Sequence, residues 1–214
     1  MRHRIFLLSA LLLILATSCS NIKTEKDMKG YGMLEVLKSR RAIRTYQDKM
    51  PDKDLIEKVL EAGTYAPTGM GDQSPIIVAV TNKKVRDRLS QLNAHVMGSN
   101  SDPFYGTPVV LVVLADKNHP THLYDGALVM GNLMNAAHAV GLGSCWVHRA
   151  KEVFETAEGK ALLKEWGIEG DYEGIGNCIL GYNSQELPLP KARKTNYIYR
   201  VESVSYTHLR AHET

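Results

Sequence analysis

Runs of apolar residues divide the chain into predicted strands. Residues 109–115 are consecutive apolar residues, a pattern typical of a central strand that is buried on both faces. Residues 76–80 and 176–182 form two further apolar runs of strand length, and residues 144–148 form a short strand or turn. These runs predict a sheet with residues 109–115 near its centre.

Apolar residues at helical spacing lie between the predicted strands. They predict helices over residues 51–63, 85–96 and 153–166, of which the last is mostly polar. Residues 124–140 are almost all small or apolar, which predicts a long helix buried on every side, either in the core or at a subunit interface. A short segment with apolar periodicity, residues 33–37, precedes them all.

Two of the connecting segments carry aromatic or basic residues. Residues 98–108 include Phe104 and Tyr105, which either close over a substrate as a lid or pack this loop against the core. Residues 187–201 contain prolines, then a basic cluster, then a strand-like stretch at 197–199.

The start of the chain is typical of an export signal. Arg2 and Arg4 precede an apolar run, residues 5–16, that is shorter than the roughly 20 residues needed to span a bilayer. Residues 16–19 resemble the lipobox of bacterial lipoproteins, in which the cysteine, here Cys19, becomes lipidated. An ordinary cleaved signal peptide is the alternative.

These features predict a division of the chain into four parts. Residues 1–18 form a signal peptide, residues 19–32 a polar tether and residues 33–202 a single domain. Residues 203–214 lack apolar periodicity, so we interpret them as a non-native or disordered tail. The predicted location is the bacterial cell envelope, where the exported lipoprotein is held at the membrane by its lipid.

Charge excludes nucleic acid as a partner. The formal net charge is +3, but residues 1–18 contain two arginines and no acid, so the remainder carries 24 basic against 23 acidic residues. Nucleic-acid binding needs a concentrated basic face. The basic residues that do cluster lie at 40–44 and 191–194, and two small clusters suit a small anionic ligand.

The first of these clusters has the chemistry of a phosphate site. Arg40, Arg41 and Arg44 follow the apolar segment at residues 33–37, and a guanidinium group can hold a phosphate through two hydrogen bonds. If a helix ends near Ser39, Arg40 and Arg44 lie on one side of the chain and can reach one anion. A solvated basic face is the alternative.

Other motifs carry little chemistry. The glycine pairs at 141–143 and 174–176 lack the further features of a dinucleotide loop, and neither a Walker A motif nor a nucleophile elbow is present. Cys145 and His148 point to opposite faces if they share a strand, which argues against a nucleophile–base pair. Cys145 and Cys178 are expected to be small buried hydrophobes, although an exported protein could join them in a disulfide. No metal site is predicted.

Several stretches, in their order and spacing, resemble the nitroreductase family of flavin enzymes. They are Ser39-Arg40-Arg41-Ala42-Ile43-Arg44, Ala66-Pro67-Thr68-Gly69 with Gln73-Ser74-Pro75, Phe104-Tyr105-Gly106-Thr107-Pro108, Gly141-Leu142-Gly143-Ser144-Cys145-Trp146 and Lys191-Ala192-Arg193. The resemblance implies an α+β, three-layer fold with a mostly antiparallel sheet flanked by helices. It also implies a homodimer that binds FMN at its interface.

The resemblance also implies roles for individual residues. The residues implied at the cofactor are Arg40, Arg41, Ala42 and Arg44, then Pro67 and Thr68 from the other subunit, Trp146, Val147 and His148 along the flavin, and Lys191 with Arg193 at the phosphate. Gly71 departs from the family pattern, because many members have Asn there. No catalytic side chain is implied, since the flavin carries the chemistry.

The implied function is FMN-dependent oxidoreduction by a ping-pong scheme. A donor, NAD(P)H or another, supplies electrons that pass to nitroaromatics, quinones or similar small electrophiles. One alternative is a family relative specialised for dehalogenation or flavin cleavage. Another is a lipid-anchored binding protein that holds a non-redox anion. Export and NAD(P)H use are in tension, because nicotinamide cofactors are kept in the cytoplasm.

Overall fold

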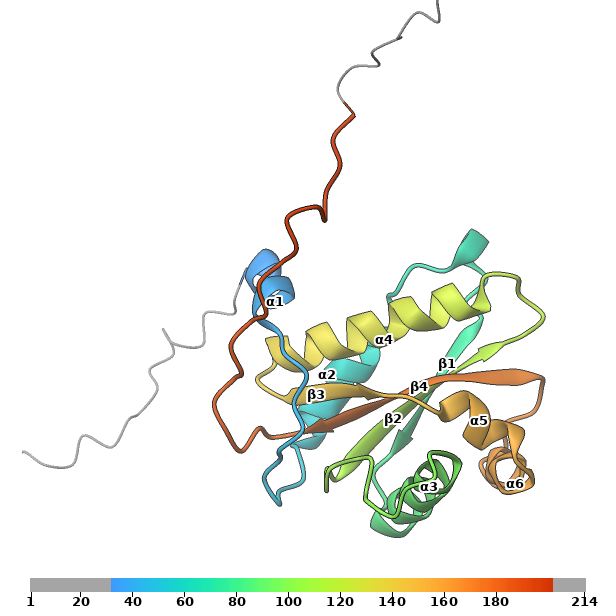
Figure 1. The fold of residues 1–214 in the computed structure, drawn as a ribbon. Coiled ribbons are helices and arrows are strands. Elements are labelled where there is room, and N and C mark those ends of the chain that lie inside the picture. Colours follow the sequence, from blue (N-terminus) through green and yellow to red (C-terminus); the bar gives the residue numbers. More distant parts are fainter. Residues whose placement is uncertain (1–31, 202–214) are drawn as a thin grey trace, which may run out of the picture.

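Four antiparallel strands form the sheet at the centre of the described part of the chain (Figure 1). They are β1 (Pro75–Val80), β2 (Val109–Asp116), β3 (Gly143–Val147) and β4 (Tyr172–Gly181). Their order across the sheet is β1-β2-β4-β3, so β2 and β4 are the central strands. Each of the four predicted strands is therefore confirmed, with β4 beginning four residues earlier than expected.

The computed structural model describes residues 32–201. The predicted signal peptide, the lipidation site Cys19, nearly all of the tether and the tail at 203–214 lie outside the described residues. Within residues 32–201, no helix combines the length and the apolarity needed to cross a bilayer.

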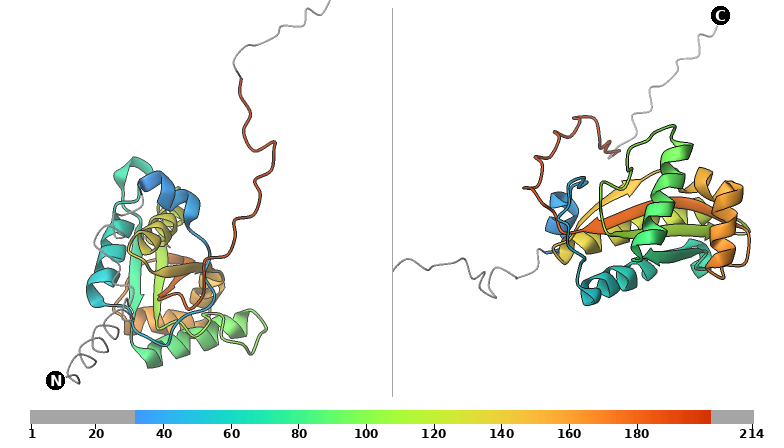
Figure 2. Two further views of the ribbon diagram at one scale, coloured as in Figure 1. Left: turned by 90° about the vertical axis from the view of Figure 1, so that its left-hand side faces the viewer. Right: turned by 90° about the horizontal axis from the view of Figure 1, so that it is seen from below.

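Helices cover both faces of the sheet, which gives three layers (Figures 1 and 2). The helices on one face are α2 (Lys53–Thr64) and α4 (His122–Ala139). Those on the other face are α3 (Lys83–Val96), α5 (Ala150–Glu155) and α6 (Ala157–Glu165). The expected α+β fold, with a mostly antiparallel sheet flanked by helices, is confirmed.

Strand β2 divides the core into two halves. Its odd-numbered residues Val109, Leu111 and Val113 pack toward α2 and α4, whereas the alternate residues pack toward α3, α5 and α6. Every residue of β2 from Val109 to Ala115 is fully buried. The apolar run at 109–115 is continuous because helices cover both of its faces.

Two expectations from the sequence are wrong. The helix predicted over residues 153–166 is two helices, α5 and α6, broken at Thr156, whose backbone is extended and whose hydroxyl caps α6 by accepting from the Gly159 amide at 2.9 Å. The stretch at 197–199 forms no strand. Its β propensity has no effect because this part of the chain leaves the sheet and meets no edge to pair with.

Burial distinguishes between the alternatives that the sequence left open for α4 and for the 98–108 loop. The outer face of α4 is exposed in the single chain, where Tyr124 is 73% and Leu128 47% exposed, so this helix is not buried on every side within one subunit. Phe104 is fully buried and packs its loop against the core, whereas Tyr105 is exposed. Of the two, only Tyr105 is accessible to a substrate.

Candidate functional site

The arginine segment, residues 40–44, runs along strand β3. Helix α1 (Met33–Ser39) ends at Ser39, which meets the condition stated above for the phosphate site. The chain then becomes extended, with the Ile43 amide donating to the Ser144 carbonyl at 2.9 Å. The Ile43 side chain is buried in the core. Because neighbouring residues of an extended chain point to opposite sides, Arg44 points outward and is exposed.

The three arginines differ in what they contact. Arg41 donates to the carbonyl oxygens of Lys38, Arg40 and Pro188 at 2.9, 2.8 and 3.2 Å, so it holds the local backbone. Among the described residues, no carboxylate forms an ion pair with Arg40 or Arg44. These two guanidinium groups therefore present positive charge that an anionic ligand can neutralise.

His138, in the last turn of α4, lies beside this segment. Its Nε2 is 2.8 Å from the Ser39 hydroxyl, which itself donates to the Glu35 carbonyl at 2.6 Å, so the proton between the ring and Ser39 belongs to the imidazole. Burial, together with the charges of Arg40 and Arg41, lowers the pKa of His138 below its ordinary value. The sequence gives no sign of this residue, because nothing in it links position 138 to position 39.

Strand β3 carries the second group of predicted site residues. Trp146 packs toward α4, Val147 toward the opposite half of the core, and His148 follows the strand and is exposed. The rings of Trp146 and His148 lie 6.0 Å apart. The indole Nε1 of Trp146 is buried and finds no acceptor among the described residues. The bridge between Ala42 and Ser144 brings the arginine segment beside this strand.

The two cysteines of the domain lie in different halves of the core. Cys145 packs toward α5 and α6, whereas Cys178 packs toward α2 and α4, and both thiols are free. Burial raises the pKa of the Cys145 thiol, and it raises that of Cys178 to about 12. The sheet therefore separates the two sulfur atoms, and neither has the character of a nucleophile. Within the described residues, no three His, Cys, Asp or Glu side chains gather to hold a metal ion.

Pro67 and Thr68 lie at the other end of α4 from the arginine segment. The amide of Gly69, next to Thr68, donates to Asp125 in the first turns of α4 at 3.0 Å, whereas His138 in the last turn meets Ser39. At 1.5 Å per residue, these two positions on α4 are about 20 Å apart. One chain therefore does not bring this loop and the arginines to the same point (Figure 1).

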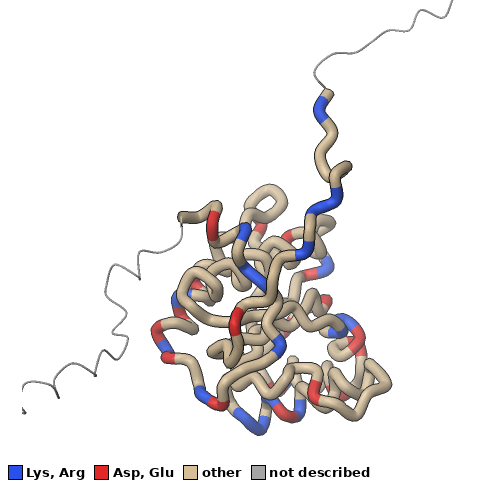
Figure 3. Tube along the Cα trace, turned by 60° about the vertical axis from the view of Figure 1, so that its left-hand side comes forward, with Lys and Arg blue, Asp and Glu red and all other residues tan. Residues whose placement is uncertain are grey.

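Lys191 and Arg193 belong to the C-terminal arm, residues 183–201, which runs past α1 and then away from the domain (Figures 1 and 2). The Ser184 amide donates to the Thr45 carbonyl at 3.2 Å, and the contact between Arg41 and Pro188 holds the next part of the arm. Beyond it the arm is exposed throughout. Figure 3 shows the basic residues of the arm extending outward from the domain. Within one chain they do not join Arg40 and Arg44.

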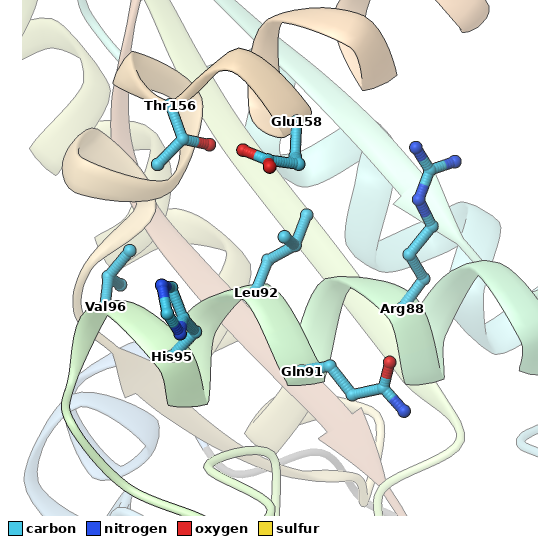
Figure 4. A pocket seen from close by; sticks show the side chains of 7 residues that line it. All are labelled: Arg88, Gln91, Leu92, His95, Val96, Thr156 and Glu158. Carbon is cyan, nitrogen blue, oxygen red and sulfur yellow. The ribbon is translucent and has the colours of Figure 1, made fainter.

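A groove of about 370 Å³ opens elsewhere, between α3 and the start of α6 (Figure 4). Its floor is apolar, and its rim is polar. It is lined by Arg88, Gln91, Leu92, His95, Val96, Thr156 and Glu158. None of the cofactor-binding residues predicted from the sequence lines this groove.

Comparisons with known proteins identify the family. The model of the nitroreductase family matches residues 37–103 and 94–182. A relative from Archaeoglobus fulgidus, provisionally named as an NADH dehydrogenase/NAD(P)H nitroreductase, is 26% identical over 169 residues, which cover 77% of this chain and 88% of the relative. A relative of the same name from Methanothermobacter thermautotrophicus is 28% identical over 118 residues; the match covers 53% of this chain and spans 59% of the relative's length.

The fold is also similar to that of a nitroreductase of known structure. The structure of a nitroreductase with bound FMN from Bacteroides fragilis is 27% identical and superposes with a TM-score of 0.74, covering 80% of this chain and 100% of that protein. The family match extends from the end of α1 to the end of β4 and so includes the arginine segment and β3. The chain belongs to the nitroreductase family.

Proposed function

We propose that this protein is an FMN-dependent oxidoreductase that passes electrons from NAD(P)H or another donor to nitroaromatics, quinones or similar small electrophiles. Its membership of the nitroreductase family supports the class of reaction. The observation that carries the proposal is the pair of guanidinium groups, Arg40 and Arg44, that lie beside β3 and have no carboxylate partner among residues 32–201. The alignment with a protein that binds FMN supports the identity of the cofactor.

The residues of the site fit the charge of FMN. Arg40 and Arg44 would hold the negatively charged cofactor, and the backbone at Trp146 and His148 would run along its flavin ring. When bound, the flavin supplies the redox chemistry. The protein therefore needs to bind, orient and shield the reactants, and no residue has to act as a nucleophile or as a metal ligand.

A homodimer would complete this site. On the single chain, the first half of α4 exposes Tyr124 and Leu128, and α1, which meets the last turn of α4, exposes Met33 and Leu34; this is apolar surface. A second copy that covers this surface would bury it. The same copy could bring its Pro67 loop to the arginines, a distance that one chain does not bridge.

Absorption spectroscopy tests the cofactor directly. We expect the purified protein, or the apoprotein after addition of FMN, to have the spectrum of a bound oxidised flavin. Stopped-flow mixing with NADH or NADPH under anaerobic conditions should then bleach that spectrum, and a nitroaromatic or quinone should restore it. If neither NADH nor NADPH bleaches the bound flavin, FMN remains the cofactor but NAD(P)H is overturned as the donor.

The same experiments separate the alternatives. A colourless protein that takes up no FMN would contradict the proposal and favour a site for a non-redox anion. A flavoprotein that fails with nitroaromatics and quinones, but removes halide from a halogenated substrate or degrades the flavin, would favour the specialised relatives. The screen of acceptors therefore follows the spectrum.

We further propose that the protein is exported and anchored in the cell envelope through a lipid on Cys19. The apolar run at residues 5–16 and the small residues before Cys19 support this location. An outward-facing enzyme would lack the cytoplasmic pool of NAD(P)H. This is the reason for including other donors in the stopped-flow test.

Replacement of Cys19 by serine tests the anchor. We expect Cys19→Ser to release the protein from the membrane fraction of its natural host, because the hydroxyl cannot form the thioether to the lipid. Cell fractionation with an immunoblot measures the distribution. Wild-type protein that is already soluble, or a variant that stays in the membrane fraction, would contradict lipidation at this residue. Cys145→Ser is the matched control, since that buried thiol is not a candidate for lipidation.

A further inference from the structure

Asp125 is a buried carboxylate without a cationic partner in the described part of the chain. It is 2% exposed and lies in the first turns of α4. Its oxygens accept hydrogen bonds from the Gly69 amide at 3.0 Å, the Ser74 hydroxyl at 2.8 Å and the Thr121 hydroxyl at 3.0 Å. Burial of a carboxylate costs several kcal/mol, so its three partners indicate what the charge is used for.

Two of those partners are the two ends of one loop. Gly69 and Ser74 bracket the residues that follow Pro67 and Thr68, and they meet on the same carboxyl group. Thr121 completes the arrangement from the turn before α4. Asp125 therefore joins the loop to the longest helix of the domain at two points.

The loop adopts a conformation that needs such support. Met70, Gly71 and Gln73 have φ of 54°, 79° and 52°, values that are strained for residues other than glycine. The side chain of Met70 is 99% exposed and gives no support. Within the loop, the Thr68 hydroxyl accepts from the Gln73 amide at 3.1 Å.

Close packing shows how tightly the loop is seated. A Cβ atom on Gly69 would collide with the hydroxyl of Thr121. Burial acts to raise the pKa of Asp125, but the bonds from Gly69, Ser74 and Thr121 outweigh it and lower that pKa below its ordinary value. The carboxylate is therefore ionised at neutral pH and can accept all three bonds.

We propose that Asp125 is a positioning residue that fixes the loop over residues 67–74 in the conformation in which Pro67 and Thr68 meet FMN. The inference rests on the proposed function, which gives this loop a contact with the cofactor. Asp125 acts through the loop and does not touch the cofactor. A loop that is already ordered loses little conformational freedom when the ligand binds, so the carboxylate contributes to affinity by preorganisation.

Three variants test this role. Asp125→Ala removes all three bonds, and Ser74→Ala removes one in case the first variant folds poorly. Asp125→Asn is the conservative change, because its amide oxygen can accept from Gly69 and its NH2 group can donate to both hydroxyl oxygens. Asn82→Ala is the matched control: the Asn82 side chain accepts from the amides of Lys84 and Val85 at the start of α3, on the other face of the sheet.

The readouts are the FMN dissociation constant from fluorescence titration of the apoprotein, the hydrogen exchange of amides 69–74 and the melting temperature. We expect Asp125→Ala to raise the dissociation constant about tenfold and to speed exchange at Gly69. Ser74→Ala should have a smaller effect in the same direction, and Asp125→Asn should restore most of the affinity. Asn82→Ala should lower the melting temperature and leave the dissociation constant unchanged.

Two results would overturn the inference. If Asp125→Ala and Ser74→Ala bind FMN and exchange at residues 69–74 as the wild type does, the carboxylate does not position the loop. If Asn82→Ala weakens FMN binding as much as Asp125→Ala at equal loss of melting temperature, the effect is general destabilisation. Wild-type apoprotein that binds no FMN would instead overturn the proposed function, and the role of Asp125 toward FMN with it.

Discussion

Replacement of Arg40 by alanine is expected to weaken FMN binding by about 1.5–3 kcal/mol, the range for a hydrogen bond to a charged partner. At about 1.4 kcal/mol per factor of ten, this is a rise in the dissociation constant of roughly 10- to 150-fold. The reason is that Arg40 is half-buried beside β3 and pairs with no carboxylate of the described residues, so its charge is available to the phosphate. Fluorescence titration of apoprotein with FMN measures the change.

The control for this variant is Arg88→Ala. Arg88 lies on α3 and pairs with Glu165 at 2.8 Å on the other side of the sheet. Its loss removes one positive charge from the protein without touching the arginine segment, and we expect FMN affinity to stay within twofold of the wild type. An Arg40→Ala protein that holds FMN as tightly as Arg88→Ala would contradict a phosphate contact at residue 40.

A related prediction concerns the C-terminal arm, residues 183–201, and mixed dimers can test it. Arg193→Ala should weaken FMN binding as Arg40→Ala does, although the two residues do not meet within one chain. If the arm reaches the partner's site, a dimer of one Arg40→Ala and one Arg193→Ala chain has one intact site and one doubly defective site. If the arm returns to its own chain, both sites carry a single defect. A titration with one tight phase of half stoichiometry would place Arg193 in the partner's site.

Replacement of Asp102 by alanine is expected to destabilise the protein by about 2–3 kcal/mol. Asp102 binds Arg86, which is 7% exposed, and it also accepts from the Ser90 hydroxyl and the amides of Phe104 and Gly106. Breaking a fully buried pair costs about 3–5 kcal/mol, and the cost here is lower because the Asp102 side chain is 34% exposed. Urea unfolding measures the loss.

Asp87→Asn is the matched control for this pair. Asp87 is the second carboxylate beside Arg86, at 3.2 Å, but its side chain is 39% exposed. An exposed ion pair contributes about 0–1 kcal/mol, so we expect a small change in stability. If Asp87→Asn and Asp102→Ala unfolded at the same urea concentration, the loop that presents Tyr105 would not depend on Asp102.

The contribution of Asp102 to the stability of the protein changes with pH in a definite direction. Burial acts to raise the pKa of this carboxyl, but the bonds from Ser90, Arg86, Gly106 and Phe104 outweigh it, and the pKa lies below its ordinary value of 3.8. Because the folded pKa is lower than the unfolded one, the stabilisation is complete above about pH 4 and is lost as the pH falls through the folded pKa. The stability difference between wild type and Asp102→Asn should therefore shrink below about pH 4, and a difference that grows there would contradict this assignment.

The sequence by itself determined the four strands and the family of the chain. Residues 109–115 are apolar without interruption, and no polar position among them could have faced water, so a strand buried on both faces was the predictable result. The arginine segment and its likeness to the nitroreductase family were visible in the residues alone. Thr156 was missed as a helix break because its pattern of neighbours continues the helical period, and only the capping contact to Gly159 shows the interruption.

Only the tertiary structure decided which side chains meet. The sequence predicts that Cys145 and Cys178 are buried, but their placement in opposite halves of the core depends on how β3 and β4 pair. Asp125 meets Gly69, and His138 meets Ser39, residues that lie far away in the chain. Periodicity reports how a residue relates to its near neighbours, whereas these contacts arise from the packing of α4 against distant segments. That packing depends on the fold of the whole domain, which no local pattern contains.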